Sequence, residues 1–303
     1  MELWTEPVVE WRSGTDSTSH HARLLTEGEL LASWPPAPFE ETATDCFRLG
    51  EEYWVWQPGI GGIRFFEDRP KLVAFPSAQV DPEWFEYLVT RSWLPAVYQI
   101  WGRQVLHASA VARSADRSAI AFAGPSCAGK STLAYGLGQR RGWSLVSDDT
   151  LAFSSGVVAG AVEISVHRLR NDARLRPASA EYFGRTAHPA ESFDWLAPPP
   201  RLAAVYFLEG DPDLPCAARI TTLKAGESYA LLLEQAHAVT LKLAKHNRQL
   251  MRDYLELAAT IPVFRLEYRR SFEAFEDVVD ALEDHLRSAP TSFAPVEIAN
   301  VLA

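Results

Sequence analysis

The sequence contains little cysteine and no long apolar run, and both absences limit what the protein can be. Cys46, Cys127 and Cys216 are the three cysteines among 303 residues. Their odd number and wide spacing support neither a disulfide framework nor a zinc site. No apolar run reaches the length of a membrane-spanning helix. We therefore expect a cytoplasmic protein with free thiols.

The sequence also lacks an excess of positive charge. It has 29 Lys and Arg residues against 39 Asp and Glu residues, which gives a formal net charge of -10. Such a chain has no overall positive field that would attract nucleic acid or anionic lipid. Residues 1–6 also lack the basic stretch and apolar core of a secretory signal. We expect neither nucleic acid nor a membrane among the partners.

Aromatic residues are plentiful and indicate a folded chain. The 10 Trp and 15 Phe provide more apolar surface than disordered chains carry. Aromatic and β-branched runs occur at residues 53–56, 63–66 and 72–75, separated by turns that contain glycine or proline. This pattern predicts a small antiparallel β-meander.

A helix is expected to follow the meander. Asp81 can cap its first turn, and Pro82 occupies the first helical position that tolerates proline. Pro95 should kink or divide this helix. We place a domain boundary near residue 100 and assign residues 1–100 to a small β-rich N-terminal domain.

The second half of the chain alternates strands and helices. Helices are expected after Lys130, at 241–259 and at 272–286, and strands at 105–112, 118–123, 144–147, 202–209 and 262–268. The short connection between the first two strands predicts an antiparallel hairpin. The alternation predicts a mixed α/β (α+β) fold for a second domain, residues 101–303.

A glycine-rich motif lies between a predicted strand and a predicted helix. It consists of Gly124, Pro125, Ser126, Cys127, Ala128, Gly129, Lys130 and Ser131. The motif matches the P-loop (Walker A) pattern, in which glycines let backbone N–H groups converge on phosphate oxygens. Lys130 should reach the β- and γ-phosphates of ATP, and the Ser131 hydroxyl should bind Mg2+. The alternative is an ordinary glycine turn, but the position between strand and helix favours nucleotide binding.

Two adjacent acids follow the next predicted strand. Asp148 and Asp149 stand at its carboxyl end, where ligands bind in open sheets. One carboxylate can hold magnesium, and the other can accept the proton of an attacking hydroxyl. Neighbouring side chains of a strand point to opposite faces, so we expect the two roles to differ. A solvated turn is the alternative.

Three further residues have two open interpretations each. His107 lies in an otherwise apolar run, and a strand histidine there can be a core side chain or a catalytic group. Arg168 and Arg170 alternate, so both could face a phosphate or be solvated at the surface.

Three segments, in this order, resemble the catalytic domain of the HPr kinase/phosphorylase family and its shorter relatives. The segments are Leu106–Val111, Ala121–Leu133 and Leu145–Asp149. The resemblance covers residues 101–175 and implies a P-loop HPr kinase-like domain that uses ATP and Mg2+ to phosphorylate a serine hydroxyl. It also implies that residues 124–132, including Thr132, bind the nucleotide.

The resemblance further implies the catalytic roles. Asp148, Asp149, His107 and Lys130 would be the catalytic residues, with Asp148 as the base and His107 near the transferred phosphate. Asp149 and Ser131 would hold the magnesium ion.

The sequence departs from the full-length kinases of this family. It contains no segment like their Glu-Ile-Arg-Gly-Leu-Gly signature, which is associated with phosphorylase activity and HPr handling. HPr as substrate, the reverse reaction and the family's hexamer are therefore not expected to carry over. The shortened relatives resemble tailoring kinases of lasso and other ribosomal peptide pathways. By this analogy the N-terminal half, around Trp54 and Trp56, is expected to hold a peptide.

Three functions remain open from the sequence. The first is a kinase for a serine of a peptide or protein, and the second is a kinase for a small hydroxylated metabolite such as free serine. The third is a nucleotide-binding module without kinase activity. We favour the first, with a peptide or protein that has an accessible serine as the partner, and leave a homo-oligomer open.

Overall fold

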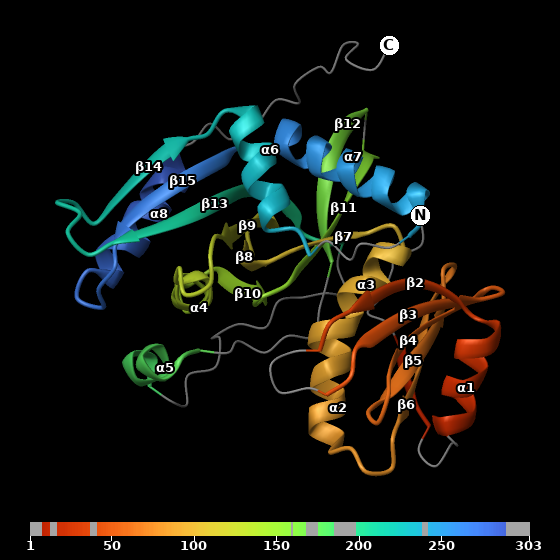
Figure 1. The fold of residues 1–303 in the computed structure, drawn as a ribbon. Helices are drawn as coiled ribbons and strands as arrows, with labels where there is room; N and C mark the ends of the chain where they lie inside the picture. Colours follow the sequence, from red (N-terminus) through yellow and green to blue (C-terminus); the bar gives the residue numbers. More distant parts are fainter. Residues whose placement is uncertain are drawn as a thin grey trace. The chain divides into compact units, whose positions relative to one another are not determined.

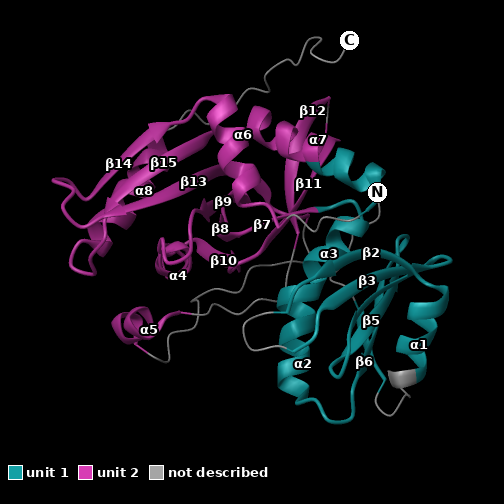
Figure 2. Cartoon of the chain, viewed as in Figure 1, with its two compact units in different colours: residues 1–103, 238–250 teal, residues 104–237, 251–303 magenta. Residues whose placement is uncertain are grey.

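The chain forms two compact units. The computed structural model describes residues 8–12, 17–36, 41–158, 160–167, 175–184, 198–237 and 242–288 (Figure 1). Unit 1 consists of residues 1–103 and 238–250, and unit 2 of residues 104–237 and 251–303 (Figure 2). Within the described part of the chain, no helix combines the length and the apolar character that a membrane span requires.

Unit 1 contains a six-stranded sheet in the order β1-β6-β5-β4-β3-β2. Strands β2 to β6 pair antiparallel with their neighbours, and β1 joins β6 in parallel. The expected meander is therefore confirmed in β4, β5 and β6. The strands are β1 (Val8–Trp11), β2 (Glu29–Trp34), β3 (Thr44–Leu49), β4 (Glu52–Gln57), β5 (Gly61–Phe66) and β6 (Arg69–Pro76).

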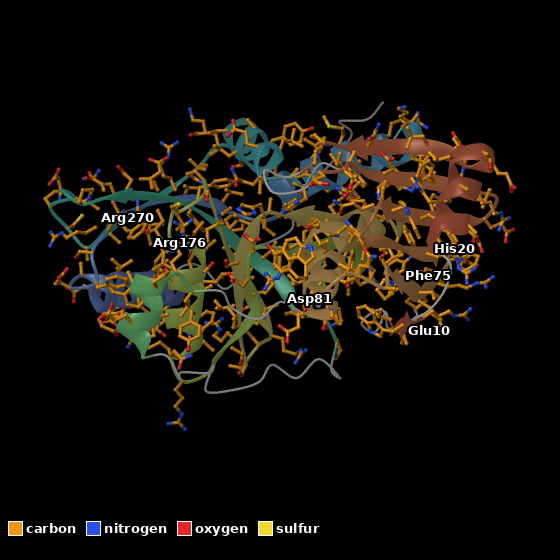
Figure 3. All side chains as sticks on the ribbon, turned by 60° about the horizontal axis from the view of Figure 1, so that its bottom comes forward. Glu10, His20, Phe75, Asp81, Arg176 and Arg270 are labelled. Carbon is orange, nitrogen blue, oxygen red and sulfur yellow. The ribbon has the colours of Figure 1, made fainter. Side chains whose placement is uncertain are left out.

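Helix α1 (Ser17–Glu27) packs on one face of this sheet. Its Leu24 shares a buried cluster with Trp54, Trp56 and Phe75, and the ring of His20 lies 5.3 Å from that of Trp54 and 5.0 Å from that of Phe75 (Figure 3). Trp54 and Trp56 are each only 2% exposed. Both indoles therefore belong to the core of this unit under α1, and the expectation that this half of the chain holds a peptide stays a prediction.

The helix expected after the meander is present and divided. Asp81 caps α2 (Pro82–Leu88) by accepting a 2.8 Å hydrogen bond from the N–H of Trp84. A π-helical turn, η1 (Val89–Trp93), separates α2 from α3 (Leu94–Ile100), in which Pro95 is the second residue. Proline lacks the N–H that continues a helical ladder, which explains why the ladder is irregular directly before it.

A distant segment returns to unit 1. The backbone N–H of Lys242 donates to the carbonyl of Leu31 at 2.8 Å, and the Nε2 of His246 lies 3.3 Å from the carbonyl oxygen of Ile100. Residues 238–250 therefore belong to this unit. The predicted single domain boundary near residue 100 leaves this segment out of the first unit. Local sequence patterns do not show that it returns, because the contacts join residues far apart in the sequence.

Unit 2 contains a nine-stranded sheet with the path β10-β8-β9-β13-β12-β11-β7, and β15 joins β13 to β14. Its strands are β7 (Gln104–Leu106), β8 (Ala108–Arg113), β9 (Ser118–Ala123), β10 (Trp143–Ser147), β11 (Leu151–Val158), β12 (Ala161–His167), β13 (Arg201–Asp211), β14 (Ala218–Thr222) and β15 (Val263–Arg269). The mixed α/β fold and the β8–β9 hairpin are as predicted.

The strand predicted at residues 105–112 is two strands. It divides at His107, because β7 pairs with β11 whereas β8 pairs with β9 and β10. The apolar character of the run is continuous, so only these long-range pairings reveal the division.

Strand directions bring several strand ends to one edge of the sheet. Strands β9 and β10 both run antiparallel to β8, and β13 and β15 run parallel to β9. The carboxyl ends of β9, β10, β13 and β15 therefore lie at the same edge as the amino end of β8. We call this edge, after the loop that follows β9, the loop edge.

Helices complete unit 2. They are α4 (Lys130–Gly138), α5 (Pro177–Phe183), α6 (Ala225–Glu234), α7 (Ala244–Thr260), which begins in unit 1, and α8 (Phe275–Ser288). Leu133 and Leu137 of α4 share one buried cluster with Val279 of α8 and Phe122 and Tyr206 of the sheet. Helices α4 and α8 therefore cover the same sheet face, which fixes the start of α4 at the loop edge.

Candidate functional site

The loop between β9 and α4 has a backbone that requires glycine. Gly124 and Gly129 have φ angles of 139° and 90°, and Cys127 also has a positive φ of 67°. A Cβ atom at Gly129 would lie 2.4 Å from the hydroxyl oxygen of Tyr268. Gly129 thus has a left-handed backbone and also lies too close to Tyr268 for a Cβ atom. Only glycine meets both conditions without strain.

Tyr268 braces this loop from the end of β15. Its buried hydroxyl donates a 2.7 Å hydrogen bond to the carbonyl of Ala128. Burial raises the pKa of Tyr268, so the hydroxyl stays protonated as a donor. No sequence pattern marks Tyr268 for this role, because in sequence it is one of several residues of a strand with alternating faces.

Lys130 is folded back over the loop. It is 7% exposed, and its Nζ donates to the carbonyls of Gly124 at 2.9 Å and Pro125 at 3.2 Å. Burial lowers the pKa of Lys130, and the carboxylates of Asp149 and Asp148 partly oppose this effect. The lysine and the two acids therefore share one electrostatic environment.

Ser131 and Thr132 stand in the first turn of α4, and both are partly buried. The Thr132 hydroxyl lies 2.9 Å from that of Ser179 in α5, so this side chain links two helices. The backbone N–H of Thr132 lies in the first turn of α4, where such groups attract anions.

The two aspartates have different environments. Asp148 is 1% exposed and accepts a 2.7 Å hydrogen bond from the hydroxyl of Ser109. Asp149 has a positive φ of 66° and an exposed side chain, with Oδ1 lying 3.5 Å from Nδ1 of His107. Both acids follow β10 at the loop edge, where one carboxylate is buried and the other is exposed.

His107 faces this site from the junction of β7 and β8. Burial lowers its pKa most, and the Lys130 ammonium lowers it further, while Asp149 and Asp148 act in the opposite direction. Its imidazole is therefore neutral near pH 7. The structure thus brings together the loop, Lys130, both aspartates and His107, all at the loop edge.

His237 also lies at this site, although it belongs to none of the sequence motifs. Its ring centroid is 5.7 Å from that of His107. The backbone N–H of His107 donates to Gln235 at 2.7 Å, and the N–H of His237 donates to Val105 at 2.9 Å. These bonds hold the segment after α6 against β7. No local sequence pattern predicts these hydrogen bonds, because they join residues far apart in the sequence.

The arginines that the sequence left open, Arg168 and Arg170, lie outside the described residues. Among the described residues, no group of three or more His, Cys, Asp and Glu side chains is arranged to hold a metal ion. Mg2+ prefers oxygen ligands and commonly takes one or two carboxylates together with substrate phosphates. The hydroxyl of Ser131 and the carboxylate of Asp149 fit such a partial set, which a bound nucleotide would complete.

Comparison with solved structures gives distant likenesses. A solved structure of the HPr(Ser) kinase/phosphatase from Coxiella burnetii is 14% identical in sequence, with a TM-score of 0.31, and the match covers 61% of this chain and 91% of that chain. No protein-family model matches the sequence. No curated protein matches it either.

Proposed function

We propose that this protein is an ATP-dependent kinase that transfers the γ-phosphate of ATP to a serine hydroxyl of a peptide or protein. One observation carries the proposal: the glycine loop with Lys130, the pair Asp148 and Asp149, and His107 converge at the loop edge. A phosphate-binding loop alone needs neither the acids nor the histidine. Their presence favours a phosphotransferase over a nucleotide-binding module.

The loop supplies the phosphate-binding elements. Its backbone N–H groups and the positive amino end of α4 attract phosphate oxygens. Lys130 is held above the loop by two carbonyls, which phosphate oxygens would replace as partners of its ammonium. Magnesium bound with the nucleotide neutralises phosphate charge, and Ser131 and Asp149 are the residues we assign to hold it.

The aspartate pair supplies the base. A carboxylate near the γ-phosphate accepts the proton of the serine hydroxyl as that oxygen attacks phosphorus. The family resemblance assigns this role to Asp148, whose carboxylate is oriented by Ser109. Because Asp148 is buried, the acceptor serine must enter deeply, which an extended peptide achieves at less steric cost than a serine on a globular surface.

His107 positions the exposed acid. Its Nδ1 lies 3.5 Å from Oδ1 of Asp149. A neutral imidazole at this place can donate a hydrogen bond to the carboxylate without cancelling its charge. The proposed role of His107 is therefore to orient Asp149 beside the phosphates.

The acceptor class rests on the resemblance to shortened HPr kinase relatives. A precursor peptide of a ribosomal, lasso-type pathway is the acceptor that we propose. Burial of Trp54 and Trp56 means that a peptide does not bind through these indoles.

A transfer assay tests the proposal. The protein is incubated with labelled ATP, magnesium and, separately, serine-containing precursor peptides, HPr and free serine, and the products are identified by mass spectrometry. We expect phosphorylated peptide serine. Stoichiometric phosphorylation of HPr, or a preference for free serine, would overturn the acceptor class, and absence of any ATP-dependent transfer would overturn the kinase.

Lys130→Ala provides the matched variant. We expect loss of transfer, with exposed Lys224→Ala as the control. The substitution removes two hydrogen bonds but also a cation whose burial is unfavourable, so we expect the melting temperature to change by less than about 4 °C, roughly 1 kcal/mol for a domain of this size. Near wild-type transfer by Lys130→Ala at saturating ATP would show that the loop does not bind the transferred phosphate.

A further inference from the structure

Two arginines lie beside the glycine loop, on the side away from Asp148. Along the loop edge the strand order is β10, β8, β9, β13 and β15, so the loop after β9 stands between Asp148, after β10, and Arg270, after β15. Strand β15 is the second strand from β9, about 10 Å away at the usual strand spacing. The backbone of Arg270 therefore lies close enough for its long side chain to extend toward the loop.

The backbone makes room for the Arg270 side chain. A Cβ atom at Gly210, the penultimate residue of β13, would lie 2.8 Å from Cδ and 3.3 Å from Cβ of Arg270. The N–H of Arg270 donates to the carbonyl of Asp211 at 3.3 Å. The stem of Arg270 thus lies against the end of β13, the strand between β15 and the loop strand.

Arg176 reaches the same place from α5. It is the residue directly before this helix, and Ser179 of α5 contacts Thr132 in the first turn of α4 at 2.9 Å. The ring of Tyr182 stacks on that of Phe272 with centroids 4.7 Å apart. Helix α5 is thus anchored both to the helix that follows the loop and to the segment that follows Arg270.

Electrostatics agrees with this placement. The pKa of the exposed Cys127 thiol, in the loop, is lowered first by a hydrogen bond with Ser126, then by the charge of Arg176 and a hydrogen bond with it, and then by the charge of Arg270. Both arginines are exposed, and among the described residues neither forms an ion pair with a carboxylate. Figure 3 labels both side chains. Within the described part of the chain, two guanidinium groups without a carboxylate partner therefore lie beside a phosphate-binding type of loop, in a protein whose net charge is -10.

We propose that Arg176 and Arg270 form a clamp that binds the polyphosphate chain of the nucleotide from the side opposite Asp148 and Asp149. The guanidinium fork matches the geometry of phosphate oxygens and forms charge-assisted hydrogen bonds with them. The clamp rests on the proposed function, because it needs a nucleotide in the loop. It leaves Asp148 and Asp149 to the acceptor and to magnesium.

Nucleotide binding by single variants tests the clamp. Affinities for ATP, ADP and adenosine are measured by calorimetry with wild type, Arg176→Gln, Arg270→Gln and the control Arg252→Gln, an exposed arginine paired with Glu256 on α7. We expect each clamp variant to bind ATP and ADP about tenfold to hundredfold more weakly, because a hydrogen bond to a charged group is lost. Thermal melting without nucleotide should not change.

The outcomes separate the clamp from the proposed function. If wild type does not bind ATP, the proposed function fails and the clamp fails with it. If wild type binds ATP and both clamp variants bind it with the wild-type affinity, only the clamp is overturned. Gly210→Ala is a second probe: because its Cβ displaces the Arg270 stem, it should weaken ATP binding in wild type and have no further effect in Arg270→Gln.

A measurement without nucleotide tests the placement itself. The thiolate is the reactive form of cysteine, and nearby cations increase its fraction. We expect iodoacetamide to alkylate Cys127 more slowly in Arg176→Gln and Arg270→Gln than in wild type, with exposed Cys216 as the internal reference. An unchanged rate in both variants would show that the arginines do not lie beside Cys127 and would overturn the clamp.

Discussion

The hydroxyl of Ser109 donates a 2.7 Å hydrogen bond to Oδ1 of Asp148, and both side chains are buried. The same hydroxyl oxygen lies 3.5 Å from the backbone N–H of Asp149. Ser109 therefore connects β8 to the turn after β10 and orients one carboxylate. This contact places the buried acid next to the loop edge with one oxygen already engaged.

Asparagine substitutions distinguish the two acids. Asp148→Asn keeps an oxygen that can accept the Ser109 bond but removes the basicity. We expect transfer to fall about 10² to 10⁴-fold, as for the loss of a general base, while ATP binding is retained. Asp149→Asn should mainly raise the magnesium concentration needed for transfer. Single-turnover rates and magnesium titrations measure both effects.

The opposite pattern would reassign the roles. If Asp148→Asn transfers phosphate normally and Asp149→Asn is inactive, the exposed carboxylate is the base. His107 contacts only that carboxylate directly, so His107→Ala should then share the defect of Asp149→Asn.

The hydrogen bond from Tyr268 to the loop predicts an effect on both stability and ATP binding. Tyr268→Phe removes the hydrogen bond to Ala128 and leaves a buried carbonyl without this donor. We expect a loss of about 0.5–1.5 kcal/mol in the free energy of unfolding and weaker ATP binding, because the loop loses a fixed anchor. Urea unfolding and calorimetry measure the two quantities.

Tyr229→Phe is the control, since the Tyr229 hydroxyl contacts only the sulfur of Met251 at 3.8 Å among the hydrogen bonds of the described residues. Unchanged ATP affinity in Tyr268→Phe would show that the brace has no part in nucleotide binding.

A third effect concerns pH and His285. Its Nδ1 lies 3.0 Å from the Tyr206 hydroxyl, and burial lowers the pKa of His285 below 6.5. In the unfolded chain the histidine takes up a proton at a higher pH than in the folded chain. Its contribution to stability is therefore complete above pH 6.5 and is lost as the pH falls below that value. The lowered pKa values of His107 and His237 act in the same direction.

The difference between wild type and His285→Phe isolates this histidine. The variant is less stable at pH 7.5 because Tyr206 loses a partner, but we expect the gap to narrow between pH 7 and pH 5. Hydrogen exchange in peptides from β13 and α8 reports the stability of unit 2 at each pH. A gap that stays constant with pH would contradict the assigned shift.

Local sequence patterns determined much of this protein. The motif with Gly124, Gly129 and Lys130 predicted a glycine loop between a strand and a helix, and the loop does lie between β9 and α4. Asp81 and Pro82 predicted a helix start, and aromatic runs between turns predicted β4 to β6. These features depend on residues within a few positions of one another, where backbone geometry and capping act.

The tertiary structure alone decided the rest. Trp54 and Trp56 are covered by α1, and the strand at residues 105–112 divides at His107, although neither outcome follows from composition. His237 and Tyr268 reach the site through the pairing of β7 with the segment after α6 and through the parallel order β9, β13, β15. Such pairings join residues far apart in the chain, and a residue's own neighbours in sequence do not encode which strand will lie beside it.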